Sequence, residues 1–154
     1  MNTQNNIIKL AWDTSWVYIK TVIDIVREPV LILSADLKVL DANNPFYRMF
    51  DVEPQDTKGK SIYELGDGQW NIPALRKLLE DILPKHTFFK GFEVTADFPG
   101  IGKKAMILNA RQIYMNSILF SSGVPVVILA IEDMTKLFSV AEILTKTLSK
   151  NQSL

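Results

Sequence analysis

Three consecutive segments in the second half of the chain show the spacing of β-strands, and they constrain the fold more than any other feature. Apolar and polar residues alternate from Phe92 to Phe98, which is the period-two pattern of a strand with one buried face. Two further apolar runs, 105–114 and 126–132, follow. Gaps of loop length join antiparallel neighbours, whereas parallel strands need a long crossover. We therefore expect an antiparallel sheet.

One of these regions also has to be tested as a membrane span. The stretch from Gln112 to Ile131 carries no charge over 20 residues, which is long enough to cross a bilayer as a helix. The sequence Ser-Ser-Gly-Val-Pro at 121–125 interrupts it, and these residues are typical of turns. We interpret the stretch as two strands joined by a loop. The first ten residues lack the features of a secretory signal, so we expect a soluble, cytoplasmic protein with no membrane insertion.

The first half of the chain predicts two more strands and a set of helices. Apolar segments at 30–33 and 39–42 are separated by a plausible turn and predict a hairpin. Asn43-Asn44-Pro45 predicts a helix start, because asparagine is favoured as an N-cap and proline in the first turn. A longer helix is predicted to begin with Asn71 as its cap and to end before Pro84.

Both ends of the chain carry apolar residues at helical spacing. Residues 5–27 predict a helix that Pro29 ends, and a second such pattern runs from Met134 to Leu148. The first helix either covers the outer face of the sheet or pairs with the same helix of a second copy. We favour a homodimer, because tryptophan is enriched at interfaces. The candidate interface residues are Trp12, Trp16, Ile19, Ile23 and Val26.

Composition excludes several kinds of functional site. Seventeen basic residues balance seventeen acidic ones, which argues against a nucleic-acid partner. The absence of cysteine excludes disulfides, thiolate nucleophiles and Cys-based zinc sites, and the single histidine, His86, excludes a multi-histidine metal site. No nucleophile motif is present. We therefore expect no metal site, no catalytic residues and no enzymatic activity in this domain.

Three local motifs, taken in this order of elements, resemble PAS sensor domains. The segment 30–46 resembles their opening, in which two strands lead to an asparagine and a short helix. Lys58-Gly59-Lys60-Ser61 resembles their Gly-Lys-Ser/Thr before the next helical turn. Glu132-Asp133-Met134-Thr135 resembles their closing Asp-Ile-Thr, with methionine in place of isoleucine. The chain is similar to the PAS modules of prokaryotic sensor histidine kinases and hybrid chemotaxis regulators.

The resemblance covers about residues 28–136 and implies an α+β fold. Its parts are a PAS-like five-stranded antiparallel sheet, short helices on one face, and flanking N- and C-terminal helices. The implied division is an N-terminal amphipathic helix at 1–28, a PAS domain at 29–135 and a C-terminal signalling helix at 136–154. The sequence contains no effector domain, which implies that one follows in a longer parent chain.

The resemblance also implies a function in signal transduction. Such a domain senses a small molecule or a partner and relays packing changes through its C-terminal helix to an effector, such as the histidine kinase of a two-component system. The residues that match the relay are Asp133 and Thr135. The alternative is a ligand-free dimerisation or docking module of a multidomain regulator, and a packed interior would favour it.

PAS sensors hold small molecules between the sheet and the short helices. The matching positions are Phe46, Tyr47, Phe50, Trp70, Leu75, Leu79, Phe92, Val94, Met106, Leu108, Leu129 and Ile131. These side chains either line a cavity or fill the core. Haem is not expected, because His86 lies beyond the predicted helix end, and thiol-adduct flavin chemistry would need a cysteine. We predict no cofactor.

Overall fold

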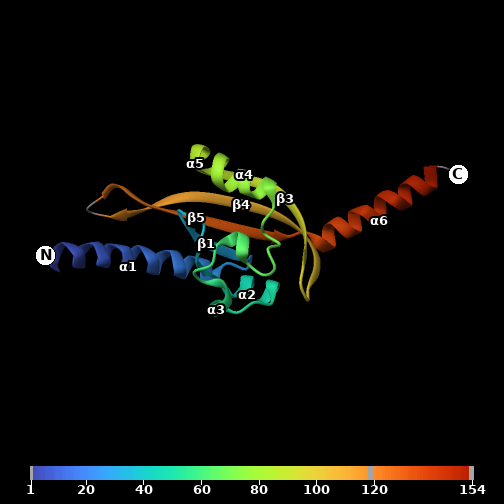
Figure 1. Cartoon of the computed structure of the whole chain (residues 1–154). Helices are drawn as coiled ribbons and strands as arrows, with labels where there is room; N and C mark the ends of the chain where they lie inside the picture. The colour runs from blue at the N-terminus through green and yellow to red at the C-terminus, as the bar shows by residue number, and fades with distance from the viewer. Residues whose placement is uncertain (1, 118–119, 153–154) are drawn as a thin grey trace.

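The computed structural model describes residues 2–117 and 120–152. Figure 1 shows the elements in chain order. They are α1 (Asn2–Ile25), β1 (Val30–Ser34), β2 (Val39–Ala42), α2 (Asn44–Phe50), α3 (Pro54–Thr57), η1 (Ile62–Glu64), α4 (Pro73–Lys77), η2 (Leu78–Ile82), α5 (Leu83–His86), β3 (Phe88–Phe98), β4 (Gly102–Ser117), β5 (Phe120–Asp133) and α6 (Thr135–Gln152).

The strands form one antiparallel sheet in the order β2-β1-β5-β4-β3. This confirms the predicted α+β class and the five-stranded sheet. The first and last strands in chain order, β1 and β5, are neighbours within the sheet. Leu31 of β1 lies opposite Leu129 of β5. Among the described residues, no helix is long and apolar enough to cross a membrane. The described residues of the uncharged stretch from Gln112 to Ile131 lie in two strands, β4 and β5.

Each face of the sheet has its own apolar cluster, because successive strand side chains point to opposite sides. Leu31 and Leu129 belong to the larger cluster, which the short helices between β2 and β3 cover. Ile32 and Val126 belong to the smaller cluster on the other face, which α1 covers through residues such as Ile23. The sheet is therefore a central layer between α1 on one face and the short helices on the other. α6 leaves the sheet at one end (Figure 1).

The helix before β3 differs from the prediction at both ends. Asn71 is not its cap: the N-cap residue is Ile72, and Asn71 instead accepts a hydrogen bond from Arg76 Nε at 2.6 Å. Pro84 does not end it, because the turn at 78–82 widens to a π-helix that ends one residue before Leu83, and Leu83 and Pro84 continue the helix as α5. A regular α-helix would place the proline ring against a carbonyl one turn back. His86, expected in a loop, is the last residue of α5, and its side chain is exposed.

The hairpin of β4 and β5 is longer than predicted, and the expected turn at 121–125 is wrong. The segment lies within β5, where Val124 pairs with Met115 and Pro125 with Tyr114. Gly123 has a φ of +66°, and a Cβ there would lie 2.9 Å from the Met115 carbonyl oxygen. β5 pairs with β1 only from Val126 onward. Proline is tolerated because no second neighbour needs its missing N–H.

Candidate functional site

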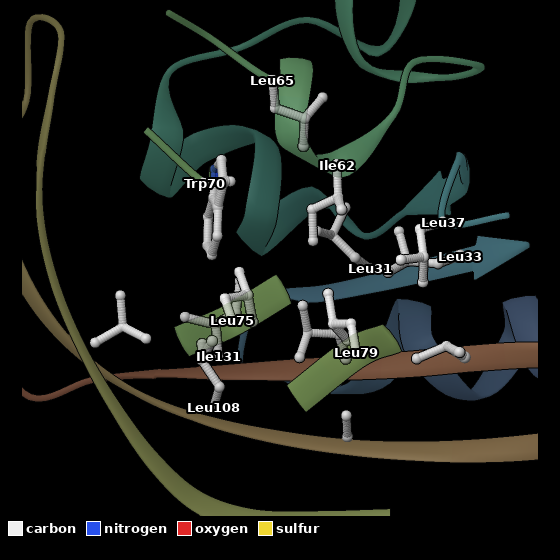
Figure 2. Packing of buried hydrophobic residues seen from close by; sticks show 14 of the residues in the cluster. Leu31, Leu33, Leu37, Ile62, Leu65, Trp70, Leu75, Leu79, Leu108 and Ile131 are labelled. Atoms are coloured by element: carbon white, nitrogen blue, oxygen red, sulfur yellow. The ribbon is translucent and has the colours of Figure 1, made fainter. Parts of the chain in front are cut away.

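The structure brings all twelve predicted pocket positions into one apolar cluster between the sheet and the short helices. Figure 2 shows part of this cluster, including Trp70, Leu75 and Leu108. Ten of them are buried, and the remaining two, Tyr47 and Phe92, are partly buried and pack against the others. Leu75 from α4 and Leu108 and Ile131 from the sheet are completely shielded from solvent. These side chains therefore pack against one another across the centre of the domain.

A cleft of about 340 Å³ lies at one end of this cluster. Three of the predicted positions line it, namely Phe46, Phe50 and Trp70. Phe98, the last residue of β3, completes its aromatic wall. The other lining residues come mainly from the loops on either side of α3 and η1, which the sequence patterns do not place in space.

The aromatic wall of the cleft is a contiguous set of rings. The Phe50 ring centroid lies 4.8 Å from that of Phe46, 5.2 Å from that of Trp70 and 5.0 Å from that of Phe98. The Trp70 and Phe98 centroids are 5.5 Å apart. These distances are within the range of favourable aromatic pairs. α2, the segment before α4 and the end of β3 thus converge on one apolar surface.

Charged side chains from α3 and the loops around it complete the lining. They are three carboxylates, Asp51, Asp56 and Asp67, and one ammonium group, Lys60. All four residues are exposed. Sequence reasoning missed them because they stand in polar segments without periodicity; the only available signal was their proximity in sequence to Phe50 and Trp70. The arrangement gives a concave surface with aromatic walls and a net negative rim.

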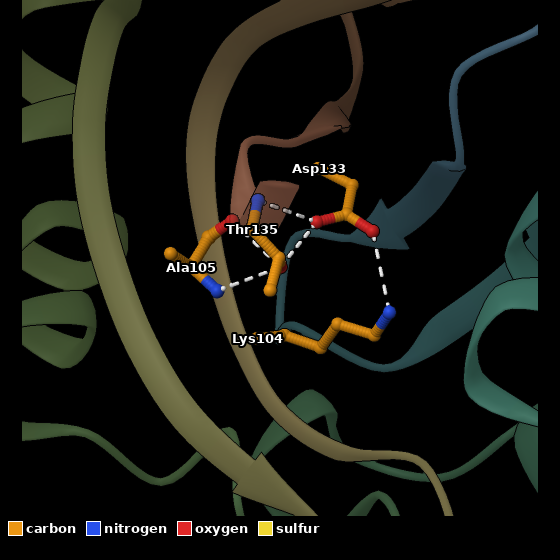
Figure 3. Close-up of polar contacts among 4 residues, drawn as sticks. All are labelled: Lys104, Ala105, Asp133 and Thr135. Atoms are coloured by element: carbon orange, nitrogen blue, oxygen red, sulfur yellow. Dashed lines mark hydrogen bonds and ion pairs between the residues drawn. The ribbon is translucent and has the colours of Figure 1, made fainter. Parts of the chain in front are cut away.

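The two predicted relay residues meet at the junction of β5 and α6 (Figure 3). The Thr135 N–H donates to Asp133 Oδ1 at 3.0 Å, and the Thr135 hydroxyl group donates to the same oxygen. Lys104 Nζ lies 3.3 Å from Asp133 Oδ2. The Ala105 N–H donates to Thr135 Oγ1 at 3.1 Å, and the Met134 N–H donates to the Ala105 carbonyl oxygen at 2.8 Å. The first turn of α6 is therefore bonded to both β5 and β4.

Asp133 is an ionised carboxylate at neutral pH in this arrangement. Burial acts to raise its pKa, but the hydrogen bonds from the Thr135 side chain and backbone and the nearby Lys104 ammonium outweigh burial. The net effect lowers the pKa of Asp133 below its usual value. The junction is thus held by a charge that persists across the physiological range.

Asn43 attaches α1 to the sheet. Its side chain is fully buried and makes four hydrogen bonds. Oδ1 accepts from the Val30 and Phe46 N–H groups at 2.9 and 3.2 Å. Nδ2 donates to the carbonyl oxygens of Ile23 and Glu28 at 3.0 and 2.8 Å. The asparagine predicted as the cap of the helix after β2 has that role and, in addition, holds the chain at the end of α1.

A buried carboxylate, Asp41, forms ion pairs with α1 and with the residue that follows α3. Asp41 Oδ2 lies 3.2 Å from Lys20 Nζ of α1, and Asp41 Oδ1 lies 3.3 Å from Lys58 Nζ, next to α3. The Ala42 N–H also donates to Oδ1 at 2.8 Å. Because β2 is an edge strand, one side chain can connect helices that cover different faces.

The structure places four predicted interface residues against the chain's own sheet. Ile23 is only 3% exposed, and Trp16, Ile19 and Val26 pack beside it on the outer face. This arrangement is the first of the two alternatives for the N-terminal helix. The side chain of Trp12 lies outside the described residues. Another stripe of α1 remains mostly exposed, consisting of Val17, Tyr18, Val22 and Ile25.

The sheet order, the short helices over one face and the polar junction before α6 define an α+β fold of the PAS type. Three solved structures illustrate the likeness. The PAS domain of BvgS from Bordetella pertussis shares 18% identity, with a TM-score of 0.60 over 92% of this chain and 99% of that one. A PAS domain from a two-component sensor histidine kinase shares 8%, with a TM-score of 0.55 over 79% and 97% of the two chains.

The third structure is a PAS domain in complex with ethanol, from a LuxR-family transcriptional regulator of Burkholderia thailandensis. It shares 14% identity, with a TM-score of 0.56 over 75% of this chain and 96% of that one. No family model matches the sequence, and the search of curated proteins gave no match. The chain therefore has the PAS fold, and the family predicted from its motifs agrees with its structural neighbours.

Proposed function

We propose that this chain is a non-catalytic sensory module that binds a small molecule and relays a packing change through α6 to an effector. The single observation that carries the proposal is the junction in Figure 3. It bonds the first turn of α6 to two neighbouring strands. No described residue of α6 is buried. The helix therefore depends on these polar bonds, rather than on a core, for its direction.

The relay follows from how the junction is built. β4 supplies Lys104 and the backbone of Ala105, and β5 supplies Asp133. A small change in the twist or pairing of these strands would redirect the first turn of α6. A ligand can drive such a change only if it binds one packing more tightly than the other. Fold-level likeness supports this reading, because one structural neighbour holds ethanol and another comes from a sensor histidine kinase.

The finer parts of the proposal are its partners and location. We propose a homodimer whose contact uses the exposed stripe of α1 at Val17, Tyr18, Val22 and Ile25, since the other stripe is buried on the sheet. The effector follows the C-terminal helix, as the histidine kinase of a two-component system would. We retain a cytoplasmic location and the absence of a cofactor as parts of this proposal.

The second candidate is a ligand-free dimerisation or docking module. The packed centre of the domain favours it, because Leu75, Leu108 and Ile131 fill the space in which the sequence allowed a cavity. The two candidates differ in whether the cleft beside this core holds a ligand.

Native mass spectrometry of the purified protein, with a denatured control, separates the two candidates. A noncovalent extra mass on the native protein supports the sensor. Bare chains that stay bare with every ligand tested support the docking module. A bare monomer would contradict the proposed α1 contact and leave α1 as cover for its own sheet.

A further inference from the structure

We propose that the cleft beside α2 and α3 is the sensory site and that its ligand is a small organic cation with an aromatic or apolar body. The inference rests on the proposed sensory function and names the place and the chemical class of the ligand. The cleft and its aromatic wall carry the proposal, and the charge of the rim decides the class.

The aromatic wall provides the apolar half of the site. Phe50 contacts Phe46, Trp70 and Phe98 through its ring, so the wall is pre-formed by packing between three segments. A cavity of about 340 Å³ suits a molecule with a single ring and a short substituent. Aromatic faces also attract a cation, which adds to the binding of an ammonium or guanidinium group.

The charge of the rim favours the same class. The lining contains three carboxylates and one ammonium group, a formal charge of −2 at neutral pH. Among the described residues, the carboxylates of Asp51, Asp56 and Asp67 make no ion pair. Asp41 and Asp133, in contrast, each lie against a lysine. The negative charge of these carboxylates is therefore not neutralised by an ion pair, so the electrostatic field of the cleft attracts cations and repels carboxylates.

The position of the cleft connects it to both ends of the fold. Phe46 and Phe50 belong to α2, which Asn43 caps and joins to the end of α1. Lys58, one of the two partners of Asp41, directly follows Thr57, which lines the cleft. Phe98 ends β3, and β3 pairs with β4. β4 carries Lys104 and Ala105 of the α6 junction and pairs in turn with β5, which carries Asp133. A ligand pressing on this wall would therefore reach the α6 junction through the pairing of β3 with β4, and not by direct contact with it.

The test uses three probes of nearly equal shape and different charge: benzylammonium, benzyl alcohol and benzoate. Binding is followed by titration in ¹H–¹⁵N NMR spectra, with the Trp70 indole N–H assigned by its loss in Trp70→Phe. We expect benzylammonium to bind most tightly and benzoate most weakly, with shifts centred on the cleft. Added salt should weaken the binding of benzylammonium and leave that of benzyl alcohol nearly unchanged.

Charge variants give the decisive comparison. The double variant Asp56→Asn with Asp67→Asn should weaken benzylammonium binding by about 2- to 20-fold, given the modest strength of exposed charge pairs. The matched control, Asp24→Asn with Asp81→Asn, removes the same charge at exposed positions that do not line the cleft and should change binding less than about 2-fold. Lys60→Gln should strengthen it.

The outcomes separate this inference from the proposed function. Tighter binding of benzoate, or equal effects of the two double variants, overturns the cation class. A native complex with an anionic molecule also overturns the class while the sensory function stands. If no probe binds and the native protein carries no ligand, both this inference and the sensory proposal are overturned. Selective binding of benzylammonium that depends on Asp56 and Asp67 supports both.

Discussion

Replacing Asp133 with alanine should loosen α6 while leaving the rest of the fold intact. The substitution removes two hydrogen bonds from Thr135 and the ion pair with Lys104. It removes nothing from either apolar cluster, because the Asp133 side chain is 36% exposed and belongs to neither. The change thus acts on the polar junction alone.

The expected loss of stability is about 1 kcal/mol. A side chain that caps the first N–H groups of a helix is worth about 0.5–2 kcal/mol, and an exposed ion pair adds about 0.2–1 kcal/mol. The two contributions together would span about 0.7–3 kcal/mol, and solvent screening at this partly exposed site places the expected loss in the lower half of that range. For a domain of this size the loss corresponds to a fall in Tm of about 2–4 °C.

Two measurements check the prediction. Thermal unfolding followed by circular dichroism should show a cooperative transition with the small shift in Tm. Native-state hydrogen exchange should show faster exchange in the first turns of α6 and little change in β1 or β5. The matched control is Asp36→Ala, an exposed carboxylate beside Lys38 in the β1–β2 turn, which should leave α6 unchanged. If Asp133→Ala unfolds, or α6 exchanges as before, the junction does not have a separable role.

The sign of the pH dependence follows from the lowered pKa of Asp133. A carboxylate whose pKa is lower in the folded protein stabilises it fully above its ordinary pKa, which is 3.8. That stabilisation is lost as the pH falls through the folded value. The α6 junction should therefore hold at neutral pH and weaken only below about pH 3.8. Asp133→Ala should lack this transition.

Three further predictions concern the attachment of α1 and the two tyrosines, Tyr47 and Tyr63, whose hydroxyl groups are buried. Asn43→Ala should destabilise the fold by about 3–4 kcal/mol in urea, because four buried hydrogen bonds worth about 1 kcal/mol each are lost. Asn43→Ser keeps an oxygen that can accept from the Phe46 N–H as a helix cap and should lose less. Equal losses in the two variants would contradict the capping role. Asp41→Asn should speed hydrogen exchange in α1 near Lys20, and unchanged exchange would show that the ion pairs are dispensable. Burial raises the pKa of Tyr47 and Tyr63 to about 12, so stability should fall as the pH rises from 10 to 12; ultraviolet titration showing both groups ionised near pH 10 would refute this.

The sequence predicts the sheet well because its signal is local. Alternation in 92–98 reports which face of a strand is buried, and the apolar runs at 30–33 and 126–132 are typical of strands buried on both faces. The structure confirms the strands in these segments. Proline and glycine are less reliable. Pro84 lies inside a helix because a π-turn removes its clash, and Pro125 lies inside a strand because that edge is unpaired. Both depend on neighbours that a local pattern does not contain.

The candidate site is only half predictable for a related reason. The aromatic residues Phe46, Phe50 and Trp70 follow from the motif order, since they are the large apolar side chains of the short helical region. The charges of the rim come from loops and from the single turn of α3, and the places of these segments are fixed by packing and not by periodicity. Asp67, for example, lines the cleft only because the segment before Trp70 folds back toward α2. The positions of the rim charges are set by tertiary packing, which leaves no periodic pattern in the sequence.

The two terminal helices differ in how they are attached, and this difference bears on the direction of signalling. α1 is held by a buried apolar stripe that includes Ile23, by the four hydrogen bonds of Asn43 and by the ion pair of Asp41 with Lys20. α6 has no buried residue among those described and is held at its first turn by the junction around Asp133. Moving α1 would open the smaller apolar cluster, whereas redirecting α6 exchanges only partly exposed polar bonds. A change in the sheet can therefore reorient α6 at much lower free-energy cost than α1, which is the property that the proposed relay through α6 requires.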